Sequence, residues 1–241
     1  MTETYDLIEY REDFIIAVQN SKMGLIDNQG KPLTEFLYDC YSVNEQNCRL
    51  NFCNKVIPMS YNSKWGVIDN NGKVIIDFQY DNIRCFYDYS YVELNRKQGV
   101  IDDKGNLIVE LKYDDIGILE EELIPVRINN KYGYIDNTGT EIIKPIYDYL
   151  FYDGFGLILA CKDGLTGFID TNNNTVIDFK YQLDTRMGFY ERDYSLAKLN
   201  NKYGIIDKQG RTIIDFIYDD IKIDKSPFIA KLDNKYSLLD I

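Results

Sequence analysis

Short runs of β-branched and aromatic residues recur along the chain, each closed by a polar turn sequence. The stretch KWGVIDNNGKVIIDFQYD, residues 64–81, shows the unit: apolar residues 67–68 and 74–76 flank Asp69-Asn70-Asn71-Gly72. Such apolar runs are typical of strands, and their consecutive apolar positions predict strands covered on both faces. Asp-x-x-Gly predicts a tight hairpin, because the carboxylate accepts backbone N–H groups where the turn starts and glycine adopts the positive φ where it ends.

Further apolar runs precede each such unit, at residues 15–18, 91–94, 123–126 and 157–160, and a short one follows, as at 113–116. No segment shows a helical period. The pattern therefore predicts an all-β chain in which each unit is an antiparallel meander of three or four strands.

The unit occurs six times with fixed internal spacing. It begins at Gly24, Gly66, Gly99, Gly133, Gly167 and Gly204. Three residues later come Asp27, Asp69, Asp102, Asp136, Asp170 and Asp207; six residues later come Gly30, Gly72, Gly105, Gly139, Asn173 and Gly210; fourteen residues later come Tyr38, Tyr80, Tyr113, Tyr147, Tyr181 and Tyr218. Asparagine in place of the second glycine fits, since it tolerates a positive φ best among the other residues. Recurrence at this period predicts a repeat architecture.

The residues around the first glycine carry a resemblance to a known family. Residues 64–69 (KWGVID), 131–136 (KYGYID) and 202–207 (KYGIID) resemble the WG-repeat family of bacterial proteins, also called KWG repeats. The resemblance covers nearly the whole chain, and departs from the motif where Met23, Gln98 or Thr166 replaces the aromatic residue and Leu165 replaces the lysine. It implies an all-β array of interaction type, and it brings no catalytic residues.

Both ends of the sequence contain parts of the motif. Residues 5–8 match the end of a unit and residues 235–240 match its beginning. Together they predict a seventh unit split between the termini, so that 1–241 is a single domain of about seven repeats. Such a split closes a propeller-like ring and removes its open sheet edges. The units are shorter than usual propeller blades, so an open β-superhelix or solenoid is the alternative.

The amino-acid composition restricts the types of catalysis and of binding partner to be expected. The chain has no histidine, which excludes Ser-His-Asp and Cys-His catalysis, and its formal charge is −12. That charge disfavours direct binding to nucleic acid or an anionic membrane and favours a basic protein partner. Five cysteines without regular spacing, no long apolar run and no secretion signal predict a cytoplasmic protein with reduced thiols.

No cofactor, metal site or catalytic residue is predicted. A calcium loop at 69–72 is rejected, because such loops place oxygen ligands at alternate positions over about a dozen residues, and Lys73 follows here. The acidity is partly architectural, since 13 of the 39 acidic residues stand at the turn aspartate or directly after the tyrosine. The negative charge is therefore either an acidic binding face or a by-product of turn chemistry.

Partner-binding residues are expected where the copies differ. Tyr87, Tyr89 and Tyr91 alternate along one strand, which predicts either a recognition stripe or packing between sheets. Two segments, 40–55 and 184–194, escape the repeat, and insertions on repeat scaffolds often lie on the binding face, although they can also be slack in a loop. The candidates in these segments are Cys48, Arg49, Phe52, Arg186, Phe189, Tyr190, Glu191, Asp193 and Tyr194.

The sequence thus predicts a non-catalytic protein-binding scaffold, most concretely a cytoplasmic immunity-type inhibitor of a basic toxin or nuclease. An adaptor in a larger assembly, a nucleic-acid mimic, and a small-molecule sensor or enzyme with a central site are the alternatives. The identity of the partner and the oligomeric state are not predicted.

Overall fold

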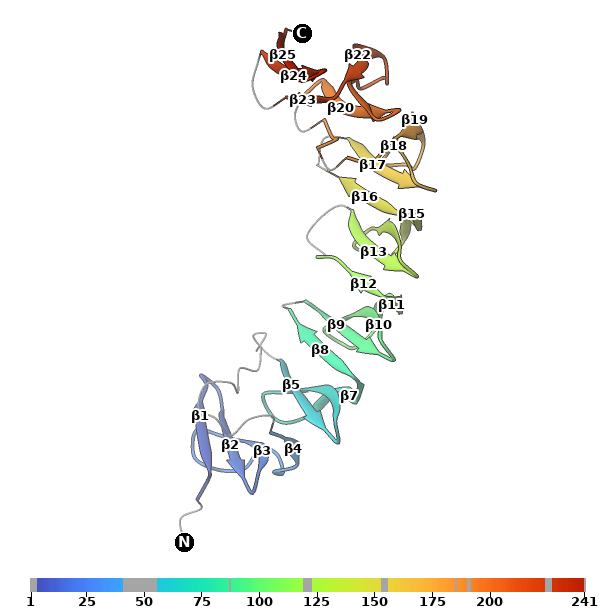
Figure 1. The fold of residues 1–241 in the computed structure, drawn as a ribbon. Helices are drawn as coiled ribbons and strands as arrows, with labels where there is room; N and C mark the ends of the chain where they lie inside the picture. Colours follow the sequence, from blue (N-terminus) through green and yellow to red (C-terminus); the bar gives the residue numbers. More distant parts are fainter. Residues whose placement is uncertain are drawn as a thin grey trace. The chain divides into compact units, whose positions relative to one another are not determined.

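The computed structural model of the protein describes residues 4–40, 56–86, 88–118, 123–152, 156–184, 186–189, 192–223 and 227–240. Every regular element in these ranges is a β-strand (Figure 1). The described part of the chain accordingly offers no helix able to cross a membrane. The predicted all-β fold class is confirmed.

The strands fall into four kinds by their place in a sheet. First strands follow the tyrosine of a unit: β1 (Leu7–Tyr10), β8 (Asn82–Cys85), β12 (Asp115–Ile116), β16 (Tyr149–Tyr152) and β23 (Asp220–Lys222). Second strands precede the lysine: β2 (Ile15–Gln19), β5 (Val56–Tyr61), β9 (Tyr89–Leu94), β13 (Ile124–Ile128), β17 (Leu157–Lys162), β20 (Tyr194–Leu199) and β24 (Phe228–Leu232). Third strands contain the lysine and the first glycine: β3 (Lys22–Ile26), β6 (Lys64–Asp69), β10 (Lys97–Asp102), β14 (Lys131–Ile135), β18 (Leu165–Asp170), β21 (Lys202–Asp207) and β25 (Lys235–Leu239). Fourth strands follow the turn: β4 (Tyr38–Asp39), β7 (Val74–Tyr80), β11 (Leu107–Tyr113), β15 (Glu141–Tyr147), β19 (Thr175–Tyr181) and β22 (Thr212–Tyr218).

These strands form seven antiparallel sheets in sequence order, named here the first to seventh sheet: β1–β4, β5–β7, β8–β11, β12–β15, β16–β19, β20–β22 and β23–β25. Each is a meander of three or four strands, as predicted. A sheet and a sequence motif are out of phase by one strand, because the first strand of a sheet directly follows the tyrosine that ends the preceding motif.

The chain divides into two compact units, Met1–Ile116 and Gly117–Ile241. Strand β1 pairs with β2, and β25 pairs with β24. The predicted single domain with a seventh repeat split between the termini, and its closure into a ring, stay predictions.

Two kinds of turn shape each sheet. At the predicted Asp-x-x-Gly turns, Asp69 Oδ1 accepts the backbone N–H groups of Asn71 and Lys73, both at 2.9 Å. Gly72 has a φ of 82° and Asn173 one of 66°. The sequence analysis missed the other turn, between the second and third strands. Its two residues, among them Asn62 and Ser63, both have positive φ, as in a type I′ hairpin.

The first glycine of the motif allows two strands to approach closely at a bulge. The register between β14 and β15 shifts at this point, and a Cβ atom on Gly133 would lie 2.4 Å from the Ile143 carbonyl oxygen. A Cβ on Gly66 would lie 2.6 Å from the carbonyl oxygen of Ile76. The glycine is therefore required for space.

The exposure of a strand's side chains depends on the strand's position in the sheet. In the third strand β6, Val67 and Ile68 are fully buried, as predicted. The prediction that the fourth strand is also covered on both faces is wrong, because Val74 of β7 is 41% exposed. An edge strand with one face toward solvent alternates instead. Within each unit, successive sheets share hydrophobic clusters, such as Leu25 with Met59 and Phe168 with Ile206.

Candidate functional site

Most of the charged residues of the repeat are used to hold the fold. The lysine of the third strand forms an ion pair with the aspartate that follows the tyrosine: Lys22–Asp39, Lys64–Asp81, Lys97–Asp114, Lys131–Asp148 and Lys202–Asp219. The ammonium groups of Lys64 and Lys202 lower the pKa of Asp81 and Asp219. We call these contacts the Lys–Asp pairs.

The same aspartates also reach the next sheet. Asp39 Oδ2 accepts the backbone N–H of Ser63 at 2.9 Å, in the type I′ hairpin of the second sheet. Asp81 Oδ2 accepts the N–H of Asn95 at 2.7 Å in the same way. Each Lys–Asp pair of this kind therefore fixes the stacking of successive sheets, and its charges are not available as a binding site.

The fifth sheet changes both members of the pair together. Leu165 replaces the lysine, and Gln182 replaces the aspartate. Gln182 Oε1 still accepts the N–H of Asn201 in the next hairpin, at 2.6 Å. The contact between sheets is thus retained without a charge.

The third sheet departs from the repeat in a way that opens a pocket. Asn82, Glu93 and Gln98 lie opposite one another on β8, β9 and β10, and form a row of three polar side chains. The same row contains a large apolar or aromatic side chain in other sheets: Leu7–Val18–Met23, Tyr149–Cys161–Thr166 and Asp220–Lys231–Tyr236. The polar row leaves a pocket of about 110 Å³, lined by Asn82, Arg84, Tyr91, Val92, Glu93 and Gln98. We call it the third-sheet pocket.

One aromatic residue, Tyr91, lines this pocket and belongs to a cluster of rings. The Arg84 guanidinium carbon lies 4.8 Å from the ring centre of Tyr91 and 5.6 Å from that of Phe86. Tyr89 and Tyr91 contact edge to face at 5.8 Å, so these two predicted tyrosines do share a face. Tyr91 is buried under the guanidinium and Tyr89 is half-buried; the third predicted tyrosine, Tyr87, lies outside the described residues.

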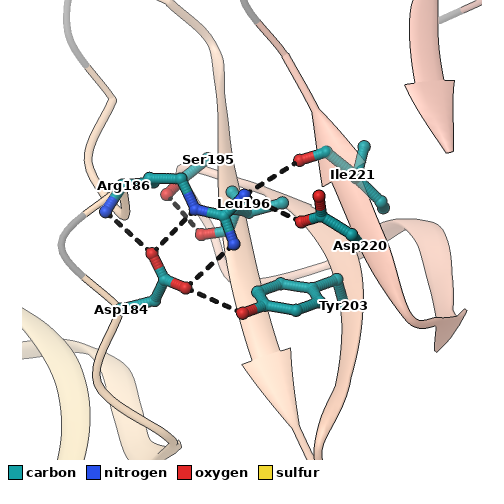
Figure 2. Close-up of polar contacts among 7 residues, drawn as sticks. All are labelled: Asp184, Arg186, Ser195, Leu196, Tyr203, Asp220 and Ile221. Atoms are coloured by element: carbon teal, nitrogen blue, oxygen red, sulfur yellow. Dashed lines mark hydrogen bonds and ion pairs between the residues drawn. The ribbon is translucent and has the colours of Figure 1, made fainter. Parts of the chain in front are cut away.

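The loop between β19 and β20 is held by Arg186. Its Nε and Nη2 each donate to one carboxylate oxygen of Asp184 at 3.0 Å, and Nη1 donates to Asp220 at 2.8 Å (Figure 2). Tyr203 donates its hydroxyl to Asp184 at 2.9 Å, and its ring lies 4.8 Å from the guanidinium carbon. We call these four residues the Arg186 clamp.

Electrostatics strengthen the clamp. The Arg186 side chain lowers the pKa of Asp184 to about 2, and hydrogen bonding to Asp184 raises the pKa of Arg186. Both groups are therefore ionised at neutral pH and satisfied by each other. The clamp ties the loop to β21 and β23, so Arg186 is engaged within the fold.

The other predicted residues of this segment separate into buried and exposed positions. Phe189 is 2% exposed, and its ring packs 5.0 Å from that of Phe168. Tyr194 is half-buried against Phe228, whereas the Asp193 side chain is 98% exposed and pairs with Lys208 at 3.1 Å. The remaining predicted residues lie outside the described part: Cys48, Arg49, Phe52, Tyr190 and Glu191.

A third surface feature was not singled out from the sequence. The fourth strands β15, β19 and β22 follow one another along one side of the second unit (Figure 1). They expose five aliphatic side chains by 37–48% and, beside them, two carboxylates that form no ion pair within the described ranges. This outer-strand face consists of Ile142, Lys144, Ile146, Val176, Asp178, Lys180, Ile213, Asp215 and Ile217, so its carboxylates lie on β19 and β22 and its two exposed lysines on β15 and β19. The single charged residue inside an otherwise apolar run, such as Asp215 within residues 213–217, is the only sequence signal that could have indicated it.

The described residues contain no group of three or more metal-ligating side chains. The chemistry that the three features offer is recognition: a zwitterionic pocket, a clamped loop and an apolar face that also carries two carboxylates and two ammonium groups.

Comparison with known proteins gives one strong match. The family model described as "WG containing repeat" matches residues 65–97, 99–132, 132–165, 167–203 and 203–236. No curated protein matches the sequence.

Several solved structures are similar to this chain at low sequence identity. PorZ of Porphyromonas gingivalis, described as an essential surface component of the type-IX secretion system, is 11% identical with a TM-score of 0.31; the match covers 98% of this chain and 38% of PorZ. Hsv2 of Kluyveromyces lactis is 10% identical with a TM-score of 0.33, and the match covers 92% of this chain and 88% of Hsv2. This chain thus spans little more than a third of PorZ, and neither similarity bears on function.

Proposed function

Because the chain belongs to the family of proteins built from WG-containing repeats, we propose that it is a non-catalytic protein-binding scaffold. Most concretely, we propose an immunity-type inhibitor that acts in the cytoplasm and covers a basic toxin or nuclease. The observation that carries this proposal is the outer-strand face of the second unit. Its aliphatic side chains supply apolar contact area, and its carboxylates favour a basic partner.

The charge pattern supports a basic partner. The repeat lysines are held in the Lys–Asp pairs, so they do not offset the other carboxylates of the surface. Asp178 and Asp215 stand at equivalent positions of β19 and β22, where β15 has Lys144, and each aspartate has an exposed aliphatic residue two positions away on the same face. The formal charge of −12 adds long-range attraction for a cationic protein.

The test starts with capture of partners on the tagged full chain at low and moderate salt, followed by mass spectrometry. Association rates of each recovered protein are then measured for the wild type, for the double variant D178N/D215N, and for D77N. Asp77 is exposed at the equivalent position of β7 in the first unit, which makes D77N a matched control.

We expect a basic protein whose association slows with added salt and with D178N/D215N, but not with D77N. An I213S/I217S variant is expected to speed dissociation, because it removes apolar contact area. Association that is insensitive to salt and to all of these variants would exclude the outer-strand face. Recovery of several acidic or neutral partners would favour the adaptor alternative.

A further inference from the structure

The third-sheet pocket lies at a motif position that has no aromatic ring in this sheet. Trp65, Tyr132, Tyr203 and Tyr236 occupy the position that Gln98 takes in β10. Gln98 Oε1 accepts the backbone N–H of Ile116 at 3.2 Å, which leaves its amide NH₂ group as a donor. The space of the missing ring is therefore edged by hydrogen-bonding groups.

The pocket contains one group of each charge without an ion-pair partner. Neither Arg84 nor Glu93 forms an ion pair with a residue that the structure describes. Arg84 is held over the Tyr91 ring, which fixes its planar fork of N–H donors. Glu93 lies diagonally across from Arg84, since it faces Asn82 while Arg84 faces Tyr91. Diagonal neighbours on one sheet face are about 7–8 Å apart, and a small ligand can bridge their side chains.

We propose that the third-sheet pocket binds a small free α-amino acid, such as glycine, alanine or serine. The ligand carboxylate accepts hydrogen bonds from Arg84 and the Gln98 amide, and its ammonium group donates to Glu93 and the Asn82 amide oxygen. This arrangement pairs both charges of the pocket at once. A pocket of about 110 Å³ holds the volume of only a few water molecules, which matches the size of a small amino acid.

This site goes beyond the proposed scaffold function. It lies in the first unit and shares no residue with the outer-strand face, so each can fail without the other. The scaffold would then also respond to the level of a metabolite.

The experiment is calorimetric titration of the full chain with alanine, and with propionate and ethylamine as probes that lack one charge each. We expect binding of alanine and none of either probe. R84Q and E93Q each remove one charge contact and are expected to weaken alanine binding about tenfold or more. R96Q, which changes an exposed arginine in the β9–β10 hairpin, is the matched control and keeps wild-type affinity.

A second variant keeps the test independent of folding defects. Q98Y restores the aromatic residue of the motif, and the packing of the ring offsets the lost hydrogen bond to the Ile116 N–H, so it is expected to fold with an unfolding midpoint close to that of the wild type while it abolishes alanine binding. Binding of propionate as strong as that of alanine would overturn the zwitterion proposal in favour of a simple anion site. No alanine binding, or binding that Q98Y leaves intact, would also overturn it.

Discussion

The lysine and the aspartate seventeen residues later act as one unit within each repeat. In five copies both are charged, and in the fifth sheet Leu165 and Gln182 replace both. Loss of only the lysine would leave a carboxylate without its cation, whereas a paired change keeps the hydrogen bond to Asn201. The joint replacement indicates that the residues at these two positions depend on each other.

This coupling predicts the outcome of a double-mutant cycle at Leu165 and Gln182. Q182D alone is expected to destabilise the fold, because the new carboxylate has no ammonium partner beside Leu165. Addition of L165K is expected to restore stability, with a favourable coupling of about 0.5 kcal/mol, as is typical of exposed pairs. Urea unfolding of the wild type and the three variants at low and high salt measures this coupling energy. Additive effects of Q182D and L165K on the free energy of unfolding would show that the two positions are not coupled.

The Arg186 clamp gives a residue-level dependence on pH. The pKa of Asp184 is about 2 in the folded protein and ordinarily 3.8. Because the folded pKa is the lower one, the unfolded chain binds this proton more tightly, and protonation favours unfolding. The stabilisation is therefore complete above pH 3.8 and is lost as the pH falls toward 2.

Accordingly, D184N is expected to lower the free energy of unfolding by about 2 kcal/mol at neutral pH, since it removes hydrogen bonds to a charged group. The difference from the wild type is expected to shrink as the pH falls below 3.8. Urea denaturation across this range measures it. D193N is the control, because Asp193 is almost fully exposed; an equal pH dependence in both variants would count against the clamp.

At the scale of the strand, the bulge glycines differ in how closely neighbouring atoms would approach an added Cβ atom. A Cβ on Gly133 would meet backbone atoms at 2.4 and 2.7 Å, whereas one on Gly24 would meet its nearest atoms at 3.1 Å. At the matching position of β25 stands Ser237, and within the described ranges β25 pairs only with β24. Serine thus replaces the glycine in a third strand that has no fourth strand beside it within the described ranges.

From this we expect G133A to destabilise the second unit by about 3 kcal/mol, in the range of severe overpacking, and G24A to cost clearly less. S237G is expected to be nearly neutral. Thermal and urea unfolding of the three variants give the comparison. Similar costs for G133A and G24A would show that backbone conformation, and not the close approach, selects glycine.

The sequence was most informative at the scale of elements. Asp-x-x-Gly spacing predicted the turns, because both the aspartate and the glycine are needed by local geometry alone. The Asn-x or Asp-x pair before each third strand, as at Asn62-Ser63, was missed although it recurs, because the sequence pattern was aligned on the glycine. The exposed side of the fourth strand was mispredicted, since apolar runs do not tell an edge strand from a central one.

The contacts of the residues predicted to bind a partner were far less predictable, and their role in binding stays a prediction. Arg186 and Phe189 stand in an irregular segment, which suggested exposure, but their roles depend on Asp220 and Phe168 in other sheets. Such long-range contacts leave no periodic trace in one sequence. The sequence showed Gln98 only as a departure from the motif. Its place in the third-sheet pocket became clear from the strand register, which puts Asn82 and Glu93 in the same row.

For the whole molecule, contacts between successive sheets predict a graded response to damage. In repeat arrays each unit is stabilised mainly by its neighbours. G133A is therefore expected to reduce the hydrogen-exchange protection of β13–β15 most, that of β16–β19 less, and that of β1–β3 least. Exchange followed by mass spectrometry resolves these segments. A uniform loss along the chain would indicate one cooperative folding unit.

The one-strand offset between motif and sheet has a consequence for how such genes lengthen. A tandem duplication that runs from one motif tyrosine to the next inserts a first, second, third and fourth strand in that order. The added segment also brings one lysine and one aspartate, so the junctions on both sides keep their polar contact. Recombination at the tyrosine codons thus adds a whole sheet without an orphaned strand, and unequal crossing-over becomes a conservative way to change repeat number.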